Sequence, residues 1–218
     1  MIKSPFYVVQ DFLSPKQCEE LVSQYQVKTP NTNLTGDPVK LEKTMEPAKG
    51  QTVIMQKLRE HIPLIEQHYD ATYRGTESLV LTHYPEFEKA PAEQPGCENS
   101  KYIKRKWLKI KDVDLTGIIW LKEYHDSIPL DPRYEVYGGK TEFPTYNFSL
   151  VPQRGSLIIF PAYPHFVHCI SPILVGDLYQ IKVNIALSHK NGGMWMYQPK
   201  EFQANGSDFI GSWFKDFL

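Results

Sequence analysis

Residues 141–187 read TEFPTYNFSLVPQRGSLIIFPAYPHFVHCISPILVGDLYQIKVNIAL, and this stretch decides the fold class. Short runs of β-branched and aromatic residues alternate in it with turn residues such as Pro, Gly and Asn, which is typical of successive short strands. Gly155, three residues after Pro152, supplies the positive φ that a tight hairpin turn requires. The stretch predicts strands over Thr141–Phe143, Ser156–Phe160, Val167–Ile170 and Leu178–Leu187.

The N-terminal third of the chain has helical periodicity instead. Ser14 stands before Pro15 as an N-cap before a proline at the first helical position, and apolar residues follow at helical spacing. A second helix is predicted over Val53–Tyr69, with a break or restart at Pro63. Between the two helices, residues 28–49 are rich in Thr, Asn, Pro and Gly, which predicts a loop with room for one short strand.

Further strand-like runs occur at Phe6–Leu13, Leu79–Tyr84 and Gly117–Leu121. Helices followed by many short strands predict an α+β chain that is mainly β, with a sandwich or barrel as its core. A length of 218 residues suits one domain. We expect a single domain over 1–218, composed of an N-terminal strand with supporting helices (1–75), the β core (76–190) and an aromatic-rich C-terminal segment that docks on it (191–218).

Composition narrows the classes of function. A formal net charge of -1 gives no global electrostatic argument for nucleic-acid binding. Three cysteines without C-x-x-C spacing indicate neither a disulfide scaffold nor a structural zinc site. No apolar stretch is long enough for a signal peptide or a membrane span, so the expected location is the cytoplasm.

Ordered motifs occur in separated segments: VVQDFLSPKQCEELV (8–22), DLTGIIWLKEY (114–124), YGGKTEFP (137–144), VPQRGSLIIFPA (151–162) and HCISPILVGDLYQI (168–181). Together they resemble the prolyl 4-hydroxylase-like branch of the iron(II)- and 2-oxoglutarate-dependent oxygenases. In that branch an opening strand and helix precede T-x-x-x-Y-L, G-G-x-T-x-F-P, P-x-x-G-x-x-x-x-F-P and H-x-V-x-P-V-x-x-G-x-R-Y. The resemblance implies a double-stranded β-helix (jelly-roll) core, the cofactors Fe(II), 2-oxoglutarate and O2, and ascorbate as an accessory reductant.

The resemblance also implies an iron site of two His and one carboxylate, written H-x-D followed by a distant His. His168 matches the distal ligand, because Pro172 and Gly176 follow it at the family offsets of four and eight. His165, three residues earlier, is the rival ligand. Glu98 matches the carboxylate, with an ordinary polar loop residue as the alternative.

The first histidine of the family pattern is missing, because Gly96 stands at its position and glycine cannot ligate. Three alternatives stay open: His165 completes the set, Cys97 contributes a thiolate, or the iron has two protein ligands and extra water. Strand alternation weighs against the thiolate, because a Glu98 side chain that points inward sends Cys97 outward.

The 2-oxoglutarate end departs from the family too. Ten residues after the distal His, where the family has Arg or Lys, this chain has Leu178. Gln180 and Lys182 share the face of Leu178 on the predicted strand. Lys182 could therefore pair with the cosubstrate carboxylate from a position deeper in the barrel than position 178. On a solvated face Lys182 would be only a surface charge. Tyr84 resembles the family tyrosine near the cosubstrate, with core packing as the alternative.

A basic and aromatic segment, Lys101–Lys111, includes Tyr102 and Trp107. Such a segment can track a phosphate backbone, and a solvated hairpin is the alternative. Peptide or small-molecule substrates are favoured, with nucleic acid left open through this segment. The expected function is a dioxygenase that couples 2-oxoglutarate decarboxylation to hydroxylation of a C–H bond. The alternative is a catalytically inactive jelly-roll binding or assembly module that has lost part of both sites.

Overall fold

The computed structural model describes residues 4–25, 40–87, 95–104 and 106–189. The expected docking of segment 191–218 therefore falls outside the described residues. Within them lie two α-helices, α1 (Pro15–Tyr25) and α2 (Gln51–Tyr69), and fifteen strands. The protein is thus mainly β with N-terminal helices. Neither of the two helices is long and apolar enough to cross a membrane.

The largest sheet is antiparallel and seven-stranded. Its order is β1 (Tyr7–Val9), β12 (Leu157–Pro161), β7 (Leu115–Trp120), β15 (Leu178–His189), β4 (Val80–Tyr84) and β2 (Leu41–Thr44), with β3 (Ala71–Thr76) paired to the far part of β15. All six residues of β7 are buried, as expected for a central strand that is covered on both faces.

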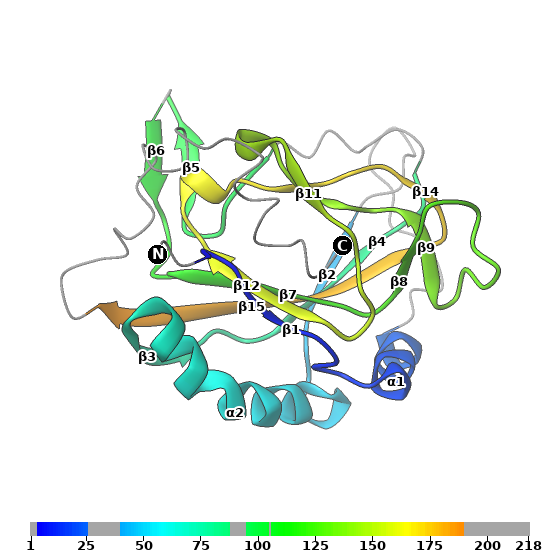
Figure 1. Ribbon diagram of the computed structural model, residues 1–218, viewed down its shortest axis with the longest axis horizontal. Coiled ribbons are helices and arrows are strands. Elements are labelled where there is room, and N and C mark those ends of the chain that lie inside the picture. Colours follow the sequence, from blue (N-terminus) through cyan, green and yellow to red (C-terminus); the bar gives the residue numbers. More distant parts are fainter. Residues whose placement is uncertain (1–3, 26–39, 88–94, 105, 190–218) are drawn as a thin grey trace.

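Smaller sheets lie across from the large one, and α1 and α2 lie on its other side (Figure 1). One of the smaller sheets has the order β11 (Phe148–Leu150), β10 (Thr141–Phe143), β13 (Cys169–Ile170). A second has the order β14 (Ile173–Val175), β9 (Glu135–Gly138), β8 (Glu123–His125), and β5 (Ser100–Ile103) pairs with β6 (Lys106–Lys109) in a hairpin. Three single 3-10 turns, η1 (Pro47–Lys49), η2 (Pro144–Tyr146) and η3 (Pro164–Phe166), connect these elements.

An aromatic cluster joins the large sheet to the β10 sheet. The ring centroid of Phe143 on β10 lies 5.1 Å from that of Phe160 on β12 and 5.4 Å from that of Phe6. All three side chains are almost fully buried, in a core that is continuous through the described residues. Edge-to-face packing of such rings stabilises the layers beyond the area they bury.

The predicted helix start at Ser14 is confirmed. The Ser14 hydroxyl accepts a hydrogen bond from the Gln17 amide at 3.2 Å, and the Gln17 side chain accepts one from the Ser14 amide at 3.0 Å. This reciprocal pair is a capping box, and it satisfies donors that the first turn leaves free.

The predicted break at Pro63 is wrong, because α2 runs without interruption from Gln51 to Tyr69. Pro63 is exposed, while the opposite face of α2 buries side chains both before and after it. Tertiary packing of that face therefore keeps the helix continuous across a residue that disfavours it. The buried side chains are Ile54, Leu58, Ile65 and Tyr69.

Gly155 adopts the positive φ that the sequence predicted, and Gly138 and Gly139 adopt positive φ as well. Gly138 has φ 90°, Gly139 has φ 72° and Gly155 has φ 82°. A Cβ atom at Gly138 would lie 2.1 Å from the Pro172 carbonyl oxygen, so a side chain there would push β9 away from the segment before β14.

Candidate functional site

Three strands of the large sheet position the floor of a cavity of about 140 Å³. Gln180 on β15 lies opposite Thr82 on β4, and Lys182 lies opposite Ile118 on β7. Residues paired directly across antiparallel strands project from the same face. All four of these side chains line the cavity, as does Tyr84. The volume is comparable to that of an engineered cavity of about 150 Å³ that holds benzene.

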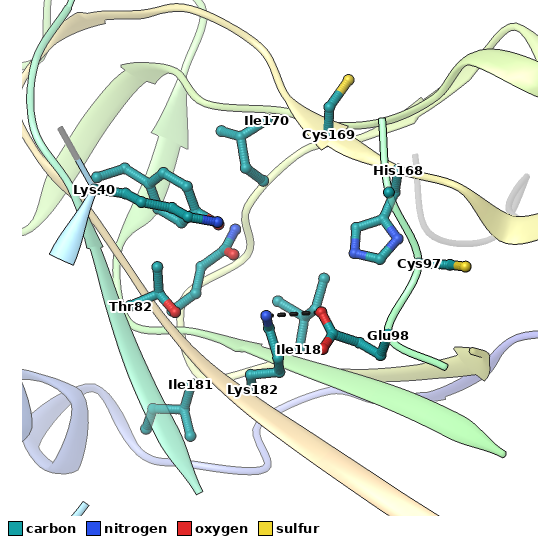
Figure 2. Close-up of a pocket in the computed structure, with 13 residues that line it drawn as sticks. Lys40, Thr82, Cys97, Glu98, Ile118, His168, Cys169, Ile170, Ile181 and Lys182 are labelled. Carbon is teal, nitrogen blue, oxygen red and sulfur yellow. Dashed lines mark ion pairs between the residues drawn. The ribbon is translucent and has the colours of Figure 1, made fainter. Parts of the chain in front are cut away.

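A short bridge places His168 beside residues 96–98. The Gly96 amide donates to the His168 carbonyl at 3.1 Å, and the His168 amide donates to the Gly96 carbonyl at 2.9 Å. Position 96, where the family pattern has its first histidine, therefore lies directly opposite His168. In Figure 2 the His168 imidazole and the Glu98 carboxylate extend toward the same space, and the Cys97 thiol points away from it.

An ion pair joins Glu98 to Lys182 inside this cavity. The Lys182 ammonium lies 2.7 Å from Glu98 Oε1 and 3.6 Å from Glu42 Oε1 (Figure 2 shows the shorter contact). Burial raises the pKa of Glu98, but the charge and hydrogen bond of Lys182, aided by His168, outweigh burial and hold that pKa below its ordinary value. Glu98 is therefore an ionised carboxylate with a cation already bound to it.

The orientation of His168 is fixed by its neighbours. Its Nδ1 lies 3.1 Å from the Phe166 carbonyl oxygen, and its ring packs on Phe160 with centroids 5.1 Å apart. A carbonyl oxygen only accepts hydrogen bonds, so Nδ1 carries a proton and Nε2 is the nitrogen that a ligand or metal would use.

The residues do not fit an iron centre of two His and one carboxylate. Gly96 has no side chain, and Lys182 holds the carboxylate of Glu98. Within the ranges the structure describes, no group of three or more His, Cys, Asp or Glu side chains could hold a metal ion.

Two of the proposed substitutes for the missing histidine lie in unsuitable places. His165, in η3, is exposed and does not line the cavity. The Cys97 thiol lies 3.6 Å from the Ser100 carbonyl, and burial raises its pKa to about 11, which disfavours the thiolate a metal needs.

The residues expected to bind 2-oxoglutarate have different environments. Leu178 is fully buried in the core and does not line the cavity. Position 178, where the family has Arg or Lys, therefore supplies no cation to the cavity. Gln180, Lys182 and Tyr84 line the cavity, which makes the side of β15 that carries Lys182 an inner face. Lys182 has protein carboxylates as partners, so its charge is balanced before any ligand arrives.

Sequence reasoning missed Thr82, which is 1% exposed. Its hydroxyl oxygen and the side-chain nitrogen of Gln180, which is 5% exposed, are buried without a hydrogen-bond partner among the described residues. Thr82 stands two residues before Tyr84 on one strand, so strand alternation could have placed it on the same face. Its lack of a partner could not be read from sequence.

The basic and aromatic segment forms the β5–β6 hairpin, which follows the cavity residues 96–98 closely in the chain. The rings of Tyr102 and Trp107 lie 5.3 Å apart across the hairpin, and both side chains are exposed. Neither lines the cavity.

Comparison with known proteins identifies the fold of the chain but no family model or curated sequence related to it. No family model and no curated protein sequence matches the chain. Solved structures match over most of the chain, and prolyl hydroxylases are among them. The protein therefore has the fold of the prolyl hydroxylase-like iron(II)- and 2-oxoglutarate-dependent oxygenases.

A viral collagen prolyl hydroxylase from Paramecium bursaria Chlorella virus-1, solved as a 2-oxoglutarate complex, has a TM-score of 0.57 and 18% identity, covering 86% of this chain and 97% of that one. A prolyl-4-hydroxylase from Pseudomonas putida has a TM-score of 0.58 and 11% identity, covering 86% and 94%. A Trichoplax adhaerens prolyl hydroxylase, in complex with a peptide fragment of the hypoxia inducible factor oxygen degradation domain, has a TM-score of 0.55 and 12% identity, covering 84% of each chain.

Proposed function

We propose that the protein binds a small carboxylate, with 2-oxoglutarate as the representative ligand, in the cavity beside Glu98 and Lys182, and that it does so without a two-His, one-carboxylate iron centre. The large sheet and the two three-stranded sheets facing it would form a jelly-roll with residues 76–190 as its core, and small ligands commonly bind in the mouth of such a barrel.

The observation that carries the proposal is the pair of unpartnered polar atoms at Thr82 and Gln180. Leaving a buried donor without a partner costs about 1 to 3 kcal/mol, so a ligand that satisfies both atoms recovers that cost. The Gln180 amide nitrogen only donates, and the Thr82 hydroxyl can donate. A carboxylate supplies acceptor oxygens for both, which makes it the ligand class that fits.

A second candidate function is the iron- and 2-oxoglutarate-dependent dioxygenase, acting on a peptide or a small molecule. Two observations favour it: the fold is that of prolyl hydroxylases, and His168 and Glu98 extend into one cavity. For this function Lys182 would have to leave Glu98, because the ammonium occupies the carboxylate that the metal needs.

Calorimetric titration with 2-oxoglutarate in the presence of EDTA tests the first candidate. We expect metal-independent binding that Gln180→Leu or Thr82→Val weakens about tenfold, the loss of one hydrogen bond to a charged group. Gln67→Leu, on the exposed side of α2, is the matched control and should bind as the unaltered protein does. Absence of binding, or equal losses in all three variants, would exclude the proposal.

The dioxygenase predicts succinate formation from 2-oxoglutarate with iron, ascorbate and O2, above the level given by His168→Ala. That variant is the necessary background, since free iron and ascorbate oxidise 2-oxoglutarate slowly by themselves. Succinate at the background level, together with metal-independent binding, supports the carboxylate-binding module. Succinate well above background supports the enzyme.

A further inference from the structure

We infer that the ammonium of Lys182 takes the place of a divalent cation as the charge partner of Glu98, so that the cavity excludes a metal by means of a cation that the chain itself supplies. The inference does not depend on which ligand fills the cavity.

The first support is the position of the ammonium. Lys182 follows Gln180 by two residues on β15, so its side chain extends from the cavity face of the sheet toward residues 96–98. There its nitrogen lies 2.7 Å from Glu98 and 3.6 Å from Glu42. An ammonium is a compact point charge, and two carboxylates converging on it resemble the surroundings of a bound cation.

The second support is the electrostatic consequence of removing that ion pair. Glu98 and Lys182 are only 18% and 22% exposed, so water cannot replace either partner fully. A metal ion that bound Glu98 would leave the ammonium without this partner and would add a like charge beside it. Both effects oppose metal binding in a site of low dielectric constant.

The third support is Gly96, which faces His168 across the bridge and removes a ligand from the same place. A side chain at position 96 would project to the side of Glu98, two residues along. Gly96 and Lys182 therefore both weaken metal binding. Gly96 provides no imidazole ligand, and Lys182 neutralises the Glu98 carboxylate that remains.

The test restores the donor and removes the lysine charge. Co(II) binding is measured by calorimetry and visible absorption for the unaltered protein, Gly96→His, Lys182→Met and the Gly96→His/Lys182→Met double variant. We expect the double variant to bind one Co(II) at least tenfold more tightly than Gly96→His alone, and the addition of His168→Ala to abolish this gain. Lys40→Met, which removes the other lysine of the cavity, should give no gain in the Gly96→His background.

Two results would overturn the inference: Co(II) affinity of the unaltered protein equal to that of the double variant, or no effect of Lys182→Met in the Gly96→His background. A measurement on the unaltered protein covers the case in which the variants do not fold. On titration with Mn(II), selective broadening of the Glu98 and His168 NMR signals would contradict the inference, and unchanged signals support it. Failure of 2-oxoglutarate to bind in the presence of EDTA would exclude the proposed function and would leave the metal-exclusion inference standing, because none of these metal measurements uses that ligand.

Discussion

Glu98 and Lys182 are each less than a quarter exposed, so each charge relies on the other for much of its stabilisation. We expect Glu98→Gln and Lys182→Met separately to lower the free energy of unfolding by about 1 to 3 kcal/mol, because each leaves a mostly buried charge without its nearest partner. The double variant should lose less than the sum of the two, since it leaves no unpaired charge.

A double-mutant cycle measured by urea unfolding checks this expectation, with Lys43→Met on exposed strand β2 as the control for loss of a lysine. Additive losses for Glu98→Gln and Lys182→Met would show that the two side chains are independent in solution. Coupling between them would agree with the 2.7 Å contact.

Several residues around the cavity were predictable from local rules. Motif offsets pointed to His168 and Glu98, and strand alternation put Gln180 and Lys182 on one face; the structure places these four around a single cavity. The partner of Lys182 was not predictable, because alternation gives the side to which a residue points and not what lies across from it. The position of Glu98 relative to β15 depends on the bridge between Gly96 and His168, a contact between residues distant in sequence.

At the scale of elements, α2 carries a proline within its length. Pro63 has no amide hydrogen to donate to the preceding turn, and a proline in a helix interior costs about 3 kcal/mol relative to alanine. Part of this cost is returned because proline restricts the unfolded chain by about 1 kcal/mol. Pro63→Ala should therefore raise the free energy of unfolding by about 2 kcal/mol.

Thermal and urea unfolding measure this change, and Leu64→Ala, at the neighbouring exposed position, serves as the control. A lower melting temperature for Pro63→Ala would mean that the proline ring makes contacts or fixes a bend that the helix needs. The expectation rests on the exposure of Pro63 and on the buried face of α2 that lies opposite it.

The strands that were predicted and those that were missed differ in where their stability arises. Runs rich in Ile, Leu and Phe, such as β7 and β12, carry their own signal because both faces are buried. Strands β3 and β9 have sequences ATYRGT and EVYG, with few buried residues, and were not predicted. They exist because β15 and β14 offer them backbone partners, and that pairing is set by tertiary structure and not by local propensity.

Across the whole molecule, the central strand β15 contributes residues both to the core and to the cavity. Tyr179, Val183 and Ile185 are almost fully buried and do not line the cavity, while Gln180 and Lys182 alternate with them and line it together with the buried Ile181. Gln180 or Lys182 can therefore change without altering the core residues that alternate with them. This separation explains how the chain keeps a prolyl hydroxylase fold although its cavity lacks the residues that an iron centre requires.

The stability of the molecule should also depend on pH through Lys122, which is 3% exposed. Its ammonium donates to the Pro132 carbonyl at 2.7 Å and lies 5.6 Å from the centroid of the Tyr179 ring. Burial lowers the pKa of Lys122 to about 8, although Asp177 and Asp131 act in the opposite direction. In the unfolded chain a lysine has a pKa of about 10.4.

Between these two pKa values the unfolded state holds more protons than the folded state, so the free energy of unfolding rises as the pH increases. The rise attributable to Lys122 approaches about 3 kcal/mol, the free energy equivalent of the shift. Lys122→Met has no such proton to lose, and the titrations of all other groups cancel when the two proteins are compared. Urea unfolding should be measured at pH 7.5, 9 and 10 and constant ionic strength. The free energy of unfolding of the unaltered protein, relative to that of Lys122→Met, should therefore increase as the pH rises. Parallel pH profiles would mean that the folded protein leaves Lys122 with an ordinary pKa, and that water reaches an ammonium which the fold otherwise encloses.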